Sequence, residues 1–177
     1  MRARVIIAAL TLSLALAGPT KSKNQPAAAN PVDQLAWLIG GTWTADGDNG
    51  PDGKAFHVET VFNWAANHRG IIFTTRFRID GKLVPVYEGL YAWHPAQKKF
   101  NFLYTDNEGA MTSGAAAWLS DTLEQEFQIV EPDGTAKTFR STVKRTGPNQ
   151  YDWNVRHQNK EGAWVPMFAL TYTRKPA

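Results

Sequence analysis

His57 and Glu59 have the residue types of a general base supported by a carboxylate. They are two positions apart, and on a β-strand this spacing places both side chains on one face. Such a pair suits general base catalysis or half of a metal site. The sequence supplies neither a nucleophile nor a third ligand with matching spacing. An exposed polar face of a strand is therefore the better interpretation.

His157 is the best candidate for a histidine inside the fold, because it alternates with Tyr151, Trp153 and Val155. An imidazole on such an apolar face can be the axial ligand of a haem if an open apolar slot lies opposite. In the alternative, His157 lies at a strand end near the mouth of the fold and is hydrogen-bonded or hydrated. The sequence leaves both interpretations open.

Glu88 is a carboxylate on a largely apolar face, since it alternates with Val86 and Leu90. If that face points inward, Glu88 is a buried acid that needs a basic partner, and it can orient the polar head of a ligand. In the alternative, Tyr87 and Tyr91 point inward and Glu88 faces solvent.

The remaining motifs point away from catalysis. The run from Asp46 to Asp52 has the alternating aspartates of a calcium loop, but Pro51 stands where that loop requires glycine and His57 where it requires glutamate. The sequence contains no Ser–His–Asp signature, phosphate loop or zinc signature. We therefore lean against an enzyme and expect no resident cofactor or metal, with the haem at His157 kept as the alternative.

The elements that position these residues are strands. From residue 41 onward apolar residues recur with period two between short turn signals, which predicts an all-β domain. Asp80-Gly81 and Asp133-Gly134 predict two-residue hairpins of type I′. The expected strands are 41–46, 55–65, 70–79, 83–93, 99–105, 111–118, 122–131, 136–145, 150–158 and 163–174. Ten strands with short connections predict an antiparallel meander that closes into a barrel, which removes its edges.

The alternation also predicts which side chains line the barrel. On the last strand Trp164 and Pro166 are expected to share the inner face with Phe168, Leu170 and Tyr172. Such an aromatic interior is either packed solid or holds a flat or aliphatic ligand against its rings. The residues expected to contact that ligand are Phe73, Phe77, Tyr104, Trp153, Val155 and Phe168, with His157 and Glu88 as polar candidates.

A short helix is expected before the first strand. Asn30 is a good N-cap, Pro31 suits the first helical position, and Asp33 favours the positive end of the helix dipole. Gly40-Gly41 ends the helix. Its apolar side is expected to close one mouth of the barrel, through Leu35, Trp37, Leu38 and Ile39.

The N-terminal 30 residues are expected to lie outside the folded domain, which spans 31–177. Residues 1–17 have a basic start, an apolar run of thirteen and small residues before Gly18, as in a cleavable export signal. Thirteen apolar residues are too few to span a bilayer, which takes about 20. Residues 18–30 are rich in Pro, Lys, Asn and Ala and are expected to be a disordered tether. We therefore expect a periplasmic or secreted protein.

The net charge and the cysteine content limit the kinds of partner and modification that the sequence predicts. The chain has no cysteine, which excludes disulfides, thiolate metal sites and a lipid anchor on cysteine. The net charge of +3 falls to about +1 without the two arginines of the signal, so a nucleic-acid partner is not expected. We expect no stable membrane anchor, and the sequence does not predict an oligomeric state.

Two runs give the chain a family resemblance. The first is Leu-Ala-Trp-Leu-Ile-Gly-Gly-Thr-Trp over residues 35–43, and the second is Tyr172-Thr-Arg174. With these runs the chain resembles calycin-type, lipocalin-like proteins. It is similar in particular to exported bacterial domains of unknown function of the DUF1579 kind, in which a Gly-X-Tyr run, here Gly89-Leu90-Tyr91, precedes a turn. The resemblance covers roughly residues 33–174 and implies that Trp43 packs under Arg174 to seal the closed end.

Two departures from related barrels weaken two specific ligands. Fatty-acid-binding proteins hold a carboxylate with Arg-X-Tyr on the last strand, whereas Tyr172-Thr-Arg174 has the reverse order. Haem-binding barrels of the nitrobindin type have Gly-X-Trp-X-Gly-X-Gly on the first strand, and here Ala45 replaces the middle glycine.

Together these patterns predict an exported barrel that binds a small hydrophobic or aromatic molecule in its lumen. One rival hypothesis is a non-catalytic interaction module whose barrel is filled. The other is a haem-dependent enzyme that uses His157.

Overall fold

A computed structural model describes residues 29–48 and 54–176 of the 177-residue chain. The predicted export signal and all but the last two residues of the predicted tether lie outside the described residues, as does most of the run from Asp46 to Asp52. No helix in the described part of the chain combines the length and apolar character needed to cross a membrane.

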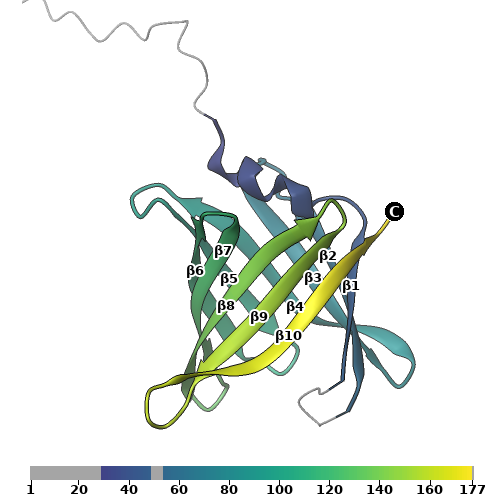
Figure 1. Cartoon of the computed structure of the whole chain (residues 1–177), viewed down its shortest axis with the longest axis vertical. Helices are drawn as coiled ribbons and strands as arrows, with labels where there is room; N and C mark the ends of the chain where they lie inside the picture. The colour runs from purple at the N-terminus through teal and green to yellow at the C-terminus, as the bar shows by residue number, and fades with distance from the viewer. Residues whose placement is uncertain (1–28, 49–53, 177) are drawn as a thin grey trace, which may run out of the picture.

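The described residues form a closed antiparallel barrel of ten strands in meander order, with β1 paired to β10 (Figure 1). This confirms the predicted all-β fold. The period-two pattern produces it, because each strand turns one set of side chains inward and the other outward. The strands are β1 Thr42–Gly47, β2 Phe56–Trp64, β3 Gly70–Ile79, β4 Lys82–His94, β5 Lys99–Asp106, β6 Met111–Leu119, β7 Thr122–Val130, β8 Ala136–Gly147, β9 Gln150–Gln158 and β10 Trp164–Lys175.

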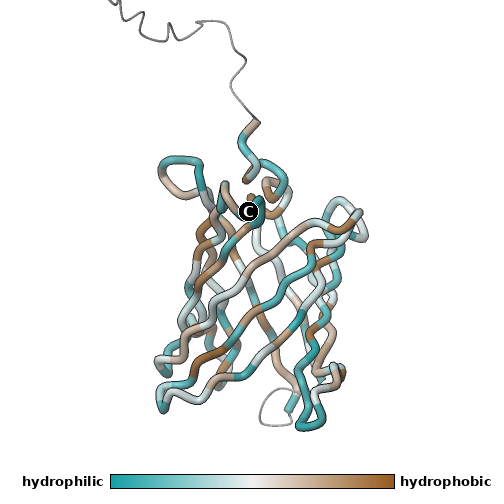
Figure 2. The backbone as a smooth tube through the Cα atoms, turned by 90° about the vertical axis from the view of Figure 1, so that its left-hand side faces the viewer, coloured by the Kyte–Doolittle hydropathy of each residue, from teal (hydrophilic) through white to brown (hydrophobic). Residues whose placement is uncertain are grey.

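A short 3₁₀ helix, η1 (Pro31–Leu38), lies across one mouth of the barrel (Figures 1 and 2). The side chain of Asn30 accepts a hydrogen bond from the backbone amide of Val32 at its start. The Asn30 amide group also donates to the carbonyl of His68, 2.7 Å away, which ties the helix to the turn between β2 and β3. Leu35 and Leu38 are buried beneath the helix, so η1 closes this end of the barrel.

Three strands carry an extra residue. The one in β8, Thr146, lies near the strand end between Arg145 and Gly147. Those in β4 and β10 change which side chains point inward. On β4 the pairing with β3 shifts between Tyr87 and Pro85, so Val86 is unpaired. On β10 the pairing with β9 shifts between Pro166 and Phe168, so Met167 is unpaired. Such bulges reverse the alternation of the strand beyond them. Proline is typical of them because it donates no ladder hydrogen bond.

The bulge in β10 corrects the predicted inner face of that strand. Phe168 points inward as expected, but Trp164 and Pro166 lie on the outer wall. There the guanidinium carbon of Arg140 lies 4.4 Å from the centre of the Trp164 ring. The expectation of a single face from Trp164 onward was wrong because it assumed an unbroken period of two.

The two predicted type I′ turns differ. Asp80 and Gly81 both have positive φ, 48° and 77°, as a type I′ turn requires. Of Asp133 and Gly134 only the glycine has positive φ, and the amide of Glu131 donates to the carbonyl of Thr135. The second connection is therefore a longer loop, and the prediction of a two-residue turn there was wrong.

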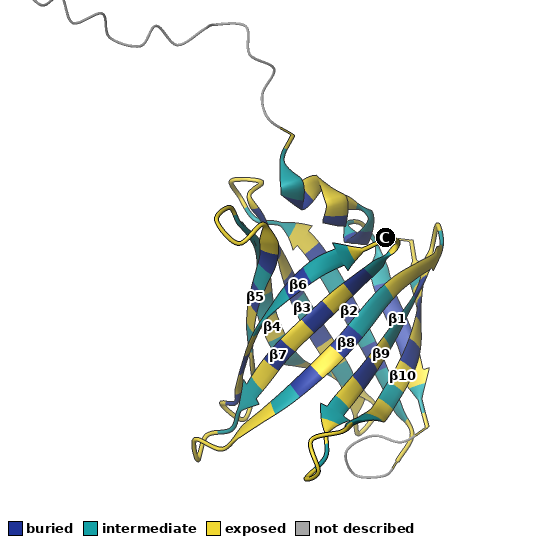
Figure 3. Ribbon diagram, turned by 60° about the vertical axis from the view of Figure 1, so that its left-hand side comes forward, coloured by how far each residue is buried: buried dark blue, intermediate teal, exposed yellow. Residues whose placement is uncertain are grey.

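Burial alternates along most strands, with one side chain turned to the interior and the next to solvent (Figure 3). Gly89 on β4 marks a point where the interior is crowded. A Cβ atom added there would lie 2.4 Å from the Cβ of Tyr104, 2.6 Å from the carbonyl oxygen of Leu103 and 2.7 Å from the ring of Phe73. Only glycine fits this close approach of neighbouring strands.

Gly89→Ala is expected to lower the free energy of unfolding by about 1–3 kcal/mol, because the added methyl group forces β4 away from β5 and from the ring of Phe73. Urea denaturation measures this loss. Gly147→Ala is the matched control, since its added Cβ would meet nothing nearer than 3.7 Å. Equal losses in the two variants would show that crowding at Gly89 is not the cause.

Candidate ligand-binding cavity

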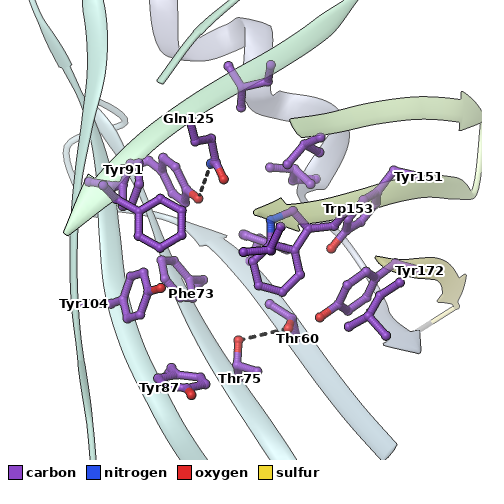
Figure 4. Close-up of a pocket in the computed structure, with 18 of the residues that line it drawn as sticks. Thr60, Phe73, Thr75, Tyr87, Tyr91, Tyr104, Gln125, Tyr151, Trp153 and Tyr172 are labelled. Carbon is purple, nitrogen blue, oxygen red and sulfur yellow. Dashed lines mark hydrogen bonds between the residues drawn. The ribbon is translucent and has the colours of Figure 1, made fainter. Parts of the chain in front are cut away.

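The barrel encloses a cavity of about 500 Å³ that is lined by 25 residues (Figure 4). This volume lies within the usual range of small-molecule sites, roughly 300–1,000 Å³. Fourteen of the lining residues are aromatic, and Leu35 and Leu38 of η1 form the cap. The cavity follows from the strand pattern, because the inward positions of most strands contribute at least one side chain.

The aromatic side chains contact one another around the wall. Phe56, Phe77, Tyr87 and Tyr104 form a run in which successive ring centres are 5.7, 5.9 and 5.5 Å apart. At the opposite wall the rings of Trp153 and Phe168 lie 5.1 Å apart. Edge-to-face and offset pairs at these distances are favourable and restrict ring motion. The wall of the cavity is therefore made largely of flat aromatic rings that hold one another in place.

A small polar network interrupts the apolar wall. The side-chain amide of Gln125 donates to the hydroxyl of Tyr91 at 2.9 Å, and its carbonyl oxygen accepts from the hydroxyl of Ser141 at 2.6 Å. The hydroxyls of Thr60 and Thr75 are 2.9 Å apart on neighbouring strands. Figure 4 shows both sets of hydrogen bonds facing the same interior space.

The tyrosines of the cavity are held in their neutral form. Burial raises the pKa of Tyr91 to about 12, although the hydrogen bond from Gln125 lowers it in part. Burial likewise raises the pKa of Tyr87, Tyr104, Tyr151 and Tyr172 above the ordinary value of 10. Desolvation disfavours the phenolate, so at neutral pH each tyrosine presents an O–H donor.

The closed end of the barrel is built around Trp43, which is fully buried. Its indole N–H donates to the carbonyl of Leu38 at 2.8 Å. The guanidinium carbon of Arg174 lies 4.4 Å from the centre of its ring, and Arg174 also donates to the carbonyl oxygens of Trp37 and Ile39. Strand β1, strand β10 and helix η1 are joined at this point.

The six apolar residues predicted to contact a ligand all line the cavity: Phe73, Phe77, Tyr104, Trp153, Val155 and Phe168. They come from inward positions on four strands, β3, β5, β9 and β10, and the meander brings them around one axis. Their contact with a ligand stays a prediction.

Glu88 does not belong to this site. It is exposed and lies in register between Thr74 and Thr105 on the outer wall. The bulge at Val86 is the reason, because it turns Tyr87 inward and the next residue outward. The prediction of Glu88 as a ligand-binding carboxylate was wrong.

His157 is partly buried near the end of β9 that lies away from η1, and it is not among the residues that line the cavity. It pairs in register with Phe139 and Val165. Its Nδ1 atom is buried and has no hydrogen-bond partner among the described residues. The described cavity wall therefore offers no imidazole to a haem.

His57 and Glu59 lie on the outer wall, where Asp46 joins them. The Nδ1 atom of His57 is 2.7 Å from a carboxylate oxygen of Asp46, and its Nε2 atom is 3.2 Å from one of Glu59. Among residues 29–48 and 54–176 no cluster of three such side chains could hold a metal ion. The imidazole is thus a cross-strand bridge between two carboxylates on a polar face.

Sequence reasoning missed the polar part of the cavity, which includes Gln125, Thr60 and Thr75. A signal for Gln125 was present, since it alternates with Leu123, Phe127 and Ile129 and is flanked by two glutamates. A neutral polar residue in the apolar register of a strand indicates a hydrogen-bonded group inside the barrel. The capping role of Leu35 and Leu38 was expected.

Comparison with known proteins supports the fold and no more specific property. No protein-family model matches the sequence, and no curated protein matches it. Among solved structures, the chain is similar to the crystal structure of Rv2717c from M. tuberculosis, with a TM-score of 0.55 and 14% sequence identity. The match covers 83% of this chain and 98% of that one. The two chains therefore share a barrel fold.

Proposed function

We propose that this protein binds a small hydrophobic or aromatic molecule in the lumen of its barrel. The observation that carries this proposal is the cavity of about 500 Å³, in which fourteen of 25 lining residues are aromatic. Flat walls of this kind contact flat or aliphatic ligands over a large area, and burial of that area drives binding.

The size of the cavity favours binding over the rival hypothesis of a filled barrel. Protein interiors are close-packed and contain few voids larger than a water molecule. A space of this volume, capped by η1 at one end, is what a container requires. No charged side chain among the described lining residues offers general acid or base chemistry, which supports a binding protein over an enzyme.

The setting that we propose is the periplasm or the extracellular space. The basic start, the apolar run and the small residues before Gly18 support export. The sequence runs over residues 35–43 and 172–174 and the closed meander support a place among lipocalin-like barrels. In that setting the protein would carry or sequester a poorly soluble molecule, without nucleic acid as a partner.

Val143→Trp tests the proposal by filling the cavity. Val143 lines the cavity and pairs in register with Leu123 and Trp153, so an added indole would occupy the ligand's space. Titration with the neutral fluorophore N-phenyl-1-naphthylamine is expected to show saturable fluorescence enhancement in the wild-type protein. Val143→Trp is expected to weaken this binding at least tenfold.

Leu103→Trp is the matched control, because Leu103 is 48% exposed on the outer wall of β5. It is expected to bind the fluorophore within twofold of wild type, and thermal unfolding checks that both variants fold. If the wild-type protein shows no saturable binding, or if both variants bind alike, the lumen is not the site and the proposal fails.

A further inference from the structure

All five tyrosines of the chain line the cavity, which is not required for packing alone. A phenylalanine ring fills nearly the same space without a hydroxyl group to desolvate, and that desolvation costs about 1–3 kcal/mol when no partner compensates it. Eight phenylalanines line the same cavity, so both ring types are used there. The tyrosine hydroxyls therefore have a polar role inside the barrel.

The hydrogen bonds between the side chains of the cavity do not use every hydroxyl proton. Tyr91 accepts from Gln125, so its own O–H proton is not used in that bond, and Gln125 uses its carbonyl oxygen to accept from Ser141. The hydroxyls of Thr60 and Thr75, 2.9 Å apart, likewise share one hydrogen bond between two O–H groups. Each such chain of hydroxyl groups holds one proton more than it has internal bonds. Figure 4 shows the hydroxyls of Tyr91, Tyr104 and Tyr172 turned into the interior space, with that of Tyr91 at Gln125.

The cavity has no charge to match an ionised ligand. None of its 25 lining residues in the described part of the chain is Lys, Arg, His, Asp or Glu. Arg174, the cation of the closed end, is engaged with the Trp43 ring and with the carbonyl oxygens of Trp37 and Ile39. A carboxylate in the lumen would lose its hydration without gaining an opposite charge, which is costly in an apolar site.

From these observations we infer that the lumen selects uncharged, largely apolar ligands that carry a hydrogen-bond acceptor such as a carbonyl oxygen, and discriminates against carboxylates of the same size. This inference rests on the proposed function. The tyrosine hydroxyls supply the donors, the surrounding rings contact the apolar body, and the lack of a cation excludes the anion.

Three naphthalenes of similar size test it: 2-acetylnaphthalene, 2-naphthoate and 2-isopropylnaphthalene. Each competes with N-phenyl-1-naphthylamine for the full-length protein at neutral pH. The ketone is expected to bind at least tenfold more tightly than the carboxylate. Tyr91→Phe is expected to weaken the ketone about five- to tenfold and to leave the hydrocarbon within twofold, because only the ketone accepts a hydrogen bond.

Ser113→Ala, which removes an exposed hydroxyl from the outer wall, is the control variant and is expected to change neither ligand. Tyr104→Phe is a second test variant for the same comparison, in case the Tyr91→Phe substitution disturbs Gln125. If 2-naphthoate binds as tightly as the ketone, or if neither tyrosine variant separates ketone from hydrocarbon, the inference fails and the proposed function stands. If the wild-type protein binds neither the fluorophore nor any naphthalene, both fail.

Discussion

Trp43→Ala is expected to lower the free energy of unfolding by about 3–5 kcal/mol, the range for removing a large buried aromatic side chain. Trp43 is fully buried, and its ring centre lies 4.8 Å from that of Tyr151 and 5.7 Å from that of Trp37. Removing it leaves a void under the helix, an unsatisfied carbonyl at Leu38 and an Arg174 side chain without its ring. Guanidinium denaturation followed by circular dichroism measures the loss.

Trp43→Phe separates the ring from its hydrogen bond. It retains an aromatic ring in the same place but removes the N–H group that donates to Leu38 at 2.8 Å. It is expected to cost about 1–2 kcal/mol, the net value of one buried hydrogen bond with some loss of packing. If Trp43→Ala costs no more than Trp43→Phe, the closed end does not depend on the ring.

The closed end could be predicted because the runs over residues 35–43 and 172–174 resemble those of lipocalin-like proteins, and that resemblance implied that Trp43 packs under Arg174. The Gly-X-Trp run and the basic residue that closes the last strand are local patterns, and β1 and β10 become neighbours as soon as the meander closes. The same holds for the strands. Predicted bounds such as 70–79 and 150–158 agree with β3 and β9, because alternation and turn residues are both local signals.

The bulges could not be predicted from such local patterns. A bulge depends on how two strands pair, and pairing is a property of both strands rather than of one. An extra residue at Val86 moved Glu88 from the inner face to the outer wall, and one at Met167 did the same to Trp164. Proline was the sequence signal for the bulges in β4 and β10, since Pro85 and Pro166 each stand beside an unpaired residue.

The polar part of the site was missed for a related reason. The aromatic wall follows from alternation, so Phe73 and Trp153 could be placed from their own strands. The partners Gln125 and Tyr91 come from β7 and β4, which are not adjacent in the barrel and meet only across its lumen. Contacts across a cavity depend on the diameter and twist of the closed barrel, which no single strand encodes.

The buried tyrosines are expected to make the stability of the barrel sensitive to alkaline pH. Burial raises the pKa of Tyr91 to about 12, and it raises the pKa of the other four tyrosines as well. A raised pKa in the folded state means that the unfolded chain loses the proton first as the pH rises. The stability due to neutral tyrosine is therefore complete below pH 10, the ordinary value, and is lost as the pH rises toward 12.

Tyr91 alone is expected to account for a loss on the order of 2 kcal/mol between pH 10 and pH 12, at about 1.4 kcal/mol per unit of pKa shift. The other four tyrosines add to it. Urea denaturation at a series of pH values measures the fall, and tyrosinate absorbance measured alongside is expected to appear together with unfolding rather than before it. Tyr91→Phe is expected to flatten the fall by about its own share.

A ligand that accepts hydrogen bonds from the neutral hydroxyls binds only the folded, protonated protein, so it opposes both ionisation and unfolding. Saturating 2-acetylnaphthalene and 2-isopropylnaphthalene are therefore both expected to move the alkaline midpoint to higher pH, and the shift is expected to be larger for the ketone, because it also opposes ionisation of Tyr91. If the tyrosines instead ionise near pH 10 while the barrel stays folded, their hydroxyls are hydrated. The lumen would then be open to water, and the donors that we assign to a neutral ligand would already be satisfied.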